Sequence, residues 1–372
     1  MEFKSNKIKL LIQVSSLVLI GLLFLNSAKA SSSESEEGGF KAGEMIMHHI
    51  SDAHEIHFIG DVSLYLPVIL STDDGFKVFS SSHFYHNEQH VENVAKNKSE
   101  HFYSYDGFVM HHEHIYYADD NGSLSFNEKG EVANRVVTLD LSITKNVFGL
   151  FFTIFLMFLI FFTVAKGYKK RGVGAPKGIQ SFIEPLILFI RDEVARPSIG
   201  KQADRFMPFL LTVFFFIWIS NLLGLIPFLG GLNITGTLSI TMVLAVFVFI
   251  LISFKANKHY WMHILWPPGV PAFVKVILVP IEIAGMFIKP IVLMVRLTAN
   301  ITAGHIIILS FVSLIFIFGQ QSVGLGYGVG VGATLFMIFM NFIELLVAFL
   351  QAYVFTLLSA IYFGSAVEEP HH

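Results

Sequence analysis

Two apolar stretches near the end of the chain limit its fold more than any other feature. They run from residue 270 to 318 and from 323 to 363, and only the polar segment 320–322 lies between them. A helix that crosses a membrane upright needs about 20 apolar residues, so each stretch must be tilted, broken or partly outside the bilayer. We therefore predict an antiparallel hairpin of two long helices that turns near residues 322–324.

Three earlier apolar runs also have the length of a membrane-crossing helix. They are residues 147–165, 206–229 and 238–254. Segment 179–196 instead has apolar residues at helical spacing and charges at both ends, which predicts a helix on the membrane surface that starts or kinks at Pro185. The chain is 53% hydrophobic and 14% charged, as is typical of integral membrane proteins. For residues 146–372 we predict an all-α polytopic membrane domain with five crossings and one surface helix.

The first 30 residues have the features of a secretory signal peptide. Lysines precede an apolar core over 10–25, and Ala28-Lys29-Ala30 fits an A-x-A cleavage site. An uncleaved first membrane helix is the alternative, and either form places the next residues outside the cytoplasm. Basic residues over 166–177 follow the first crossing and predict a cytoplasmic segment by the positive-inside rule. The two signals agree on a periplasmic mature N-terminus and a cytoplasmic C-terminus.

Residues 31–145 form a polar region with a different pattern. Short alternating runs are separated by Asp-Gly and Asn-Gly dipeptides, which predicts a small, mostly β extracytoplasmic domain after the linker 31–39. The chain has no cysteine, which excludes disulfides and thiolate metal sites. The sequence has no basic tract of the kind that would indicate nucleic acid as a partner.

Most of the histidines belong to this region, in two groups. They are His48, His49, His54 and His57, followed by His83, His86, His90, His101, His111, His112 and His114. With Glu113 nearby they could bind zinc or copper, or form a pH-sensitive surface. Their spacings fit no single site template, so we predict neither a metal site nor a cofactor.

Arg296 stands inside the sequence KPIVLMVRLTANITAG, with long apolar runs on both sides. An arginine at bilayer depth costs at least about 2.5 kcal/mol and usually lines a bundle interior or a water-filled path. Its guanidinium cannot shed its charge to lower that cost. Snorkelling to the membrane surface is the alternative, but Arg296 is far from either end of its apolar run. We predict that this cation has a functional role.

Further polar side chains share the first long helix. Glu282, Lys289 and Arg296 follow one another at intervals of seven residues. Seven residues make two turns of an α-helix to within about 20°, so successive side chains point in nearly the same direction. With Asn300 one turn later, they lie on one face. His305 points to a different side, roughly opposite Arg296.

Folding the hairpin brings the second helix level with the first. Glu344 and Gln351 are also seven residues apart, and a turn near residue 324 places Gln351 level with Arg296 and Glu344 level with His305. A histidine–glutamate pair inside a membrane can pass protons at physiological pH. Arg296 cannot, but its charge would attract a deprotonated carboxylate on a partner and block leakage. Simple hydrogen bonding between helices is the alternative for His305 and Glu344.

The hairpin sequences KPIVLMVRLTANITAGH and FIELLVAFLQAYVFTLLSAIYF resemble the signature hairpin of the a subunit of F-type ATP synthase. NLLGLIPF, at 221–228, is similar to the second-pass motif of that family, and the resemblance covers about residues 147–369. It implies a non-catalytic, proton-translocating subunit of the F0 sector in the bacterial inner membrane. The implied partners are a rotating ring of c subunits, the b subunits and other ATP synthase subunits, membrane lipid and protons.

The resemblance also implies residue roles. Arg296 would be the essential arginine that faces the ring carboxylate, with Asn300 and Gln351 as its polar neighbours. The groups of the two aqueous half-channels would be Glu282, His305 and Glu344. Many bacterial members have a carboxylate where His305 stands and a histidine where Glu344 stands; here the two are exchanged, as in mitochondrial relatives. The signal peptide and the β-like domain are absent from the short members.

Two other readings come from different functional classes. A self-contained ion-coupled transporter would need internal repeats around a substrate cavity, and the sequence has no repeat. A metal-binding or receptor module with a membrane anchor would not need ionisable groups in the bilayer. The glycine-rich segment 324–332 lacks the GK[ST] ending of a phosphate loop, so nucleotide chemistry would lie in partner subunits. The choice between H⁺ and Na⁺ depends on the ring carboxylate.

Overall fold

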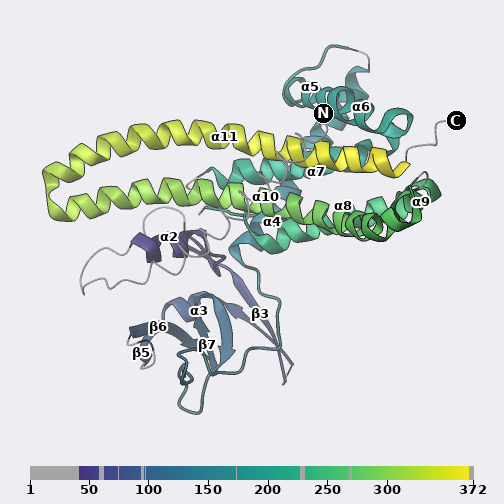
Figure 1. The fold of residues 1–372 in the computed structure, drawn as a ribbon. Helices are drawn as coiled ribbons and strands as arrows, with labels where there is room; N and C mark the ends of the chain where they lie inside the picture. Colours follow the sequence, from purple (N-terminus) through teal and green to yellow (C-terminus); the bar gives the residue numbers. More distant parts are fainter. Residues whose placement is uncertain are drawn as a thin grey trace, which may run out of the picture. The chain divides into compact units, whose positions relative to one another are not determined.

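The structure is a computed structural model, and it describes residues 42–57, 63–73, 75–93, 96, 98–172, 174–226, 231–267 and 270–367 (Figure 1). The predicted signal peptide, 1–30, and the linker, 31–39, lie outside the described residues. The chain divides into the units Met1–Met45 and Ile46–His372. Helix α2 (Ala42–Ile50) begins in the first unit, and everything that follows concerns the second.

The region after α2 is built from short antiparallel strands. They are β1 (Glu55–His57), β2 (Ser63–Tyr65), β3 (Pro67–Thr72), β4 (Gly75–Ser80), β5 (Glu88–Asn93), β6 (Lys98–Tyr105), β7 (Phe108–His111), β8 (His114–Tyr117) and β9 (Leu139–Asp140). Among the described residues they form a β1–β2 pair, a β4–β3–β9 sheet and a β5–β6–β7–β8 sheet. One short helix, α3 (Ser82–Tyr85), follows β4. The expectation of a mostly β N-terminal region is confirmed.

Two tight turns connect β6, β7 and β8. Asp106 and Gly107 have φ of 48° and 80°, the left-handed geometry that the Asp-Gly dipeptide favours in a two-residue hairpin. His112 and Glu113 also have positive φ, 47° and 64°, although neither is glycine. Non-glycine residues seldom adopt this conformation, which is why the sequence did not mark the second turn.

Apolar side chains from these strands pack into cores within the β region. The larger cluster is Val68, Leu70, Phe84, Phe108, Met110, Ile115 and Val137. In β3 the buried Val68 and Leu70 alternate with more exposed neighbours, the period of two expected for a strand with one buried face. Burial of these side chains holds the region together without disulfides.

The rest of the chain is helical. Its helices are α4 (Lys145–Arg171), α5 (Ile179–Phe189), α6 (Arg196–Ile199), α7 (Ala203–Gly224), α8 (Leu238–Lys255), α9 (Lys258–Leu265), α10 (Ala272–Gln321) and α11 (Val323–Val367). By length and composition, five helical spans within the described part could cross a membrane, with Ile179–Gly224 counted as one span. The predicted hairpin is confirmed: α10 and α11 lie side by side and turn at Ser322, whose backbone is extended (Figure 1).

The segment predicted as a surface helix is more broken than expected. Pro185 lies inside α5, and the π-helical turn Ile190–Ala195 joins α5 to α6. Proline removes a backbone donor, and π-turns are common where a helix bends. Gly200, with φ of 70°, then separates α6 from α7 through the 3₁₀ turn Gly200–Gln202.

Helix α7 is the centre of the helical region. Thirteen of its 22 residues are buried, against five of 27 in α4 and four of 18 in α8. It packs against α4 and α11, and the ring of Phe206 stacks on Phe363 with centroids 4.6 Å apart. Gly364 allows the close approach of α11 to α6, because a Cβ there would overlap the Ser198 carbonyl oxygen. The end of α11 thus attaches the hairpin to α6 and α7.

Candidate functional site

One side of α10 packs into the helical bundle. Leu293, Leu297 and Ile301 recur every four residues and are almost completely buried. The hydroxyl of Thr298 on the same helix lies 2.7 Å from the hydroxyl of Thr241 on α8. These contacts fix the rotation of α10 about its axis, and they determine which residues face away from the bundle.

Arg296 and Asn300 are exposed on the outer side of α10, one turn apart. Across the described ranges, the Arg296 guanidinium makes no salt bridge with a carboxylate of this chain. Gln351 is half-buried on α11, and the structure shows no hydrogen bond between Gln351 and Arg296 in the residues it describes. The predicted arginine–glutamine pair is therefore not joined by a hydrogen bond in the described part of the chain. The structure presents the arginine on a surface.

Glu344 of α11 is only 5% exposed. Neither of its carboxylate oxygens has a hydrogen-bond partner among the residues that the structure describes. The Glu344 carboxylate packs against Gly304, where an added Cβ would lie 2.5 Å from Oε1. Burying a carboxylate without partners is costly, so this group requires water or a proton.

A polar cavity of about 150 Å³ adjoins Glu344, and its lining includes His305, Asn341 and Asn233. This volume is large enough for water, and the lining offers several polar partners to hydrate the carboxylate. His305 and Glu344, which were predicted from the sequence to lie at one level of the hairpin, thus line the same cavity. Their nitrogen and carboxylate atoms can exchange protons through water there.

Gly304 gives a direct test of this arrangement. We expect Gly304→Ala to lower by at least half the ATP-driven proton pumping that the resemblance implies, because the new methyl group displaces the flexible end of Glu344 and leaves the backbone in place. Pumping in inverted membrane vesicles, measured by quenching of a pH-sensitive dye, checks this.

Gly285→Ala is the matched control, because Gly285 is on the same helix and has nothing within 4 Å of an added Cβ. Pumping should be unchanged in the control. The amount of the chain must be equal in the membranes that carry the two variants. Equal pumping by both variants would contradict a role for the position of Glu344.

Asn221 connects α7 to the helix that carries Glu344. Its side chain is buried, its Nδ2 donates to the Ala348 carbonyl at 3.1 Å, and its Oδ1 accepts from the Thr235 hydroxyl. Ala348 lies one turn after Glu344, so these bonds position that part of α11. Asn221 belongs to the motif NLLGLIPF, and its role was not predicted from the sequence, although an amide inside an apolar crossing is a signal of such a role.

The other ionisable groups of α10 lie nearer its start. The Lys289 ammonium is 5.2 Å from the centre of the Tyr362 ring. Glu282 is half-buried near Tyr260 of α9, and burial and then the charge of Glu282 raise the pKa of that tyrosine. Along a helix rising 1.5 Å per residue, Glu282 is about 21 Å before Arg296, and His305 is about 14 Å after it. The two polar regions thus lie on opposite sides of Arg296.

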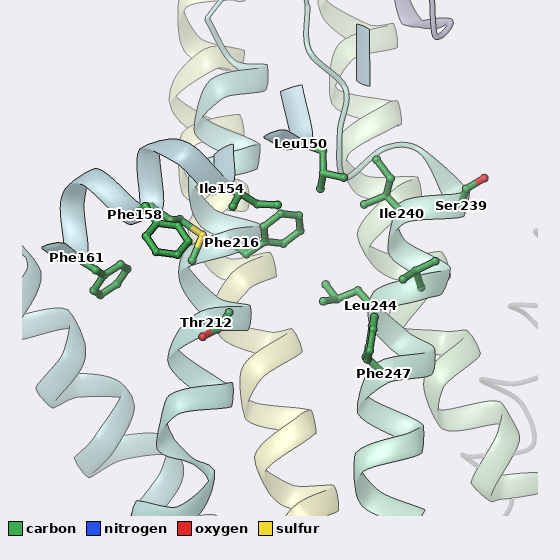
Figure 2. A pocket seen from close by; sticks show the side chains of 12 residues that line it. Leu150, Ile154, Phe158, Phe161, Thr212, Phe216, Ser239, Ile240, Leu244 and Phe247 are labelled. Carbon is green, nitrogen blue, oxygen red and sulfur yellow. The ribbon is translucent and has the colours of Figure 1, made fainter. Parts of the chain in front are cut away.

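A larger hollow of about 680 Å³ lies between α4, α7 and α8. Figure 2 shows side chains such as Phe158, Phe216 and Phe247 around it, with Thr212 and Ser239 as the hydroxyl groups. It shares no lining residue with the polar cavity and offers no charged group to an ion. The polar cavity is the better candidate for an ion path.

Comparison with known proteins decides the family. Residues 147–364 match the family described as ATP synthase A chain. The chain belongs to this family. Among its relatives, ATP synthase subunit a 2 of Chlorobaculum tepidum is 42% identical over 267 residues, which cover 69% of this chain and 72% of the relative. ATP synthase subunit a 2 of Prosthecochloris aestuarii is 37% identical over 319 residues, 83% of this chain and 93% of the relative.

A second match covers the β region of this ATP synthase A chain family member. Residues 45–141 match a family described as a domain of unknown function, DUF8433. The two matched segments do not overlap, and α4 begins between them at Lys145. The description of the second family gives no activity for the β region.

Proposed function

We propose that this chain is the proton-translocating a subunit of an ATP synthase and performs no nucleotide chemistry itself. The proposal rests on the exposure of Arg296: its permanent positive charge lies on the surface of a helix that is long and apolar enough to cross a membrane. Such a charge requires a compensating group. Because no carboxylate of the chain pairs with it in the described part, that group belongs to a partner, the ring of c subunits. The b subunits and the other ATP synthase subunits complete the assembly.

The two polar regions on either side of Arg296 form the two half-channels of the proposed mechanism. A proton enters through one region, neutralises a ring carboxylate, travels with the rotating ring and leaves through the other. His305 and Glu344 serve one half-channel, and Glu282 serves the other. Arg296 attracts each deprotonated carboxylate as it passes and blocks direct leakage between the channels. Asn300 and Gln351 supply polar contacts beside it.

The proposed location is the inner membrane of a bacterium. Lys169, Lys170 and Arg171 end α4, which supports a cytoplasmic position for that end by the positive-inside rule. The predicted signal peptide, removed or not, places the β region in the periplasm. With five crossings, the C-terminus is then cytoplasmic.

A cross-linking experiment tests the partner. The chain has no cysteine, so a single introduced cysteine can carry a thiol-linked photo-crosslinker at one defined position. We expect Ala299→Cys, next to Arg296 on the exposed side of α10, to cross-link to a c subunit in the purified complex. Mass spectrometry of the product identifies the partner.

Phe158→Cys on α4 is the control, because Phe158 is exposed on a different helix. It should give no product with a c subunit. A chain that purifies alone and transports ions by itself would instead support the self-contained transporter.

A further inference from the structure

We propose that the β region binds a divalent transition-metal ion, with Zn²⁺ as the natural probe, through Glu100, His111 and His112. The ligand atoms of these three side chains all lie within 4.8 Å of one another. The Oε2 atom of Glu100 is 2.9 Å from Nε2 of His111 and 3.7 Å from Nε2 of His112. Metal binding by the β region does not depend on proton translocation by the helical region.

The fold builds this cluster from two neighbouring strands and their turn. Glu100 is on β6, His111 ends the adjacent β7, and His112 opens the turn into β8. The left-handed backbone of His112 sets its ring against that of His111, with centroids 4.1 Å apart. Strain of this kind persists only where the surrounding structure holds it, and it is common at ligand sites.

Hydrogen bonds orient the two buried ligands. Nδ1 of His111 lies 3.0 Å from the His101 carbonyl oxygen, which can only accept, so Nδ1 carries the proton. In a neutral ring Nε2 is then unprotonated and faces Glu100. Asn93 Nδ2 donates to the other oxygen of Glu100 at 3.2 Å, which leaves Oε2 directed at the histidines. A histidine bonded to a carbonyl through one nitrogen and facing a metal with the other is the usual arrangement of a metal ligand.

The distances suit a metal ion. Tetrahedral zinc with bonds of about 2.0–2.1 Å separates its ligand atoms by about 3.3 Å, and the two observed separations fall on either side of that value. The adjoining cavity, about 390 Å³, is also lined by His114 and Glu131 and leaves room for a further ligand or water. His111 is 6% exposed and Glu100 9%, while His112 is 72% exposed and marks the open side.

From the sequence alone we predicted no metal site, and Glu113 was the only carboxylate considered beside the histidines. Glu113 instead bonds to His54 at 3.2 Å and to the Tyr85 hydroxyl at 3.2 Å. The side chain that completes the cluster is Glu100, which stands about ten residues before the histidines and has no spacing motif with them. Imidazole and carboxylate donors without thiolate suit Zn²⁺ or Cu²⁺.

Zinc binding to the full-length chain in detergent tests the proposal. The chain is loaded with Zn²⁺ and dialysed, retained metal is counted by mass spectrometry, and the Kd is measured by competition with a chelator. We expect one Zn²⁺ per chain, and a Kd at least about tenfold weaker in His112→Ala and in Glu100→Gln. X-ray absorption of the bound zinc should show two imidazole ligands.

His90→Ala is the matched control, because His90 is an exposed histidine of the same sheet outside the cluster. Its Kd should equal that of the unchanged chain. His112 is exposed, so its removal should leave the fold intact, which circular dichroism checks. An unchanged Kd in His112→Ala, an equal loss in His90→Ala, or no retained zinc would each overturn the proposal.

Discussion

Arg296→Ala should abolish ATP-driven proton pumping by the assembled complex. Opposite unit charges about 4 Å apart, at an effective dielectric constant of about 20, attract by about 4 kcal/mol, or roughly three orders of magnitude in an equilibrium or a rate. Removing the guanidinium removes this attraction for the passing carboxylate and the barrier to leakage. Dye quenching in inverted vesicles measures pumping, and passive proton flux through membranes stripped of the catalytic sector measures the leak.

Lys289→Ala is the control for the loss of any cation from this helix. Lys289 lies two turns before Arg296 and is also exposed, but its ammonium is near the Tyr362 ring. We expect this variant to keep most of its pumping. Normal coupled pumping in Arg296→Ala, with equal assembly, would refute the role of Arg296 as the gate.

Exchanging His305 and Glu344 should preserve more pumping than removing either side chain. Both groups adjoin one cavity, so the double variant His305→Glu with Glu344→His keeps a proton-exchanging pair in the same space. The single variants His305→Ala and Glu344→Ala leave one group without its partner. Groups that share a site typically show coupling of about 0.5–3 kcal/mol in a double-mutant cycle.

Pumping by the two single alanine variants and by the double alanine variant supplies that cycle. Strictly additive losses would show that the two residues act independently and would remove the pair from the proposed half-channel. Asn341→Ala is a useful companion, because Asn341 lines the same cavity but donates its hydrogen bond to the Met337 carbonyl on its own helix. Its loss should affect pumping less than the loss of Glu344.

Much of the helical architecture could be predicted because lipid imposes simple rules. Long apolar runs must be helical, and one polar break between two such runs must be a turn, as Ser322 is. The broken course of residues 179–202 was not predicted in detail. Its π-helical and 3₁₀ turns depend on close packing against α7 and α11, which periodicity does not report.

Sequence alone determined that a charged arginine stands within the apolar hairpin and that a polar region precedes it, and it predicted that a histidine and a glutamate would stand level with each other further along the hairpin. These follow from the spacing of residues along regular elements. Only the tertiary structure decided that Arg296 faces outward, that Asn221 ties α7 to α11, and that Glu100 meets His111 and His112. Each of these depends on contacts between distant segments, because side-chain packing between elements sets the rotation of a helix and the pairing of strands.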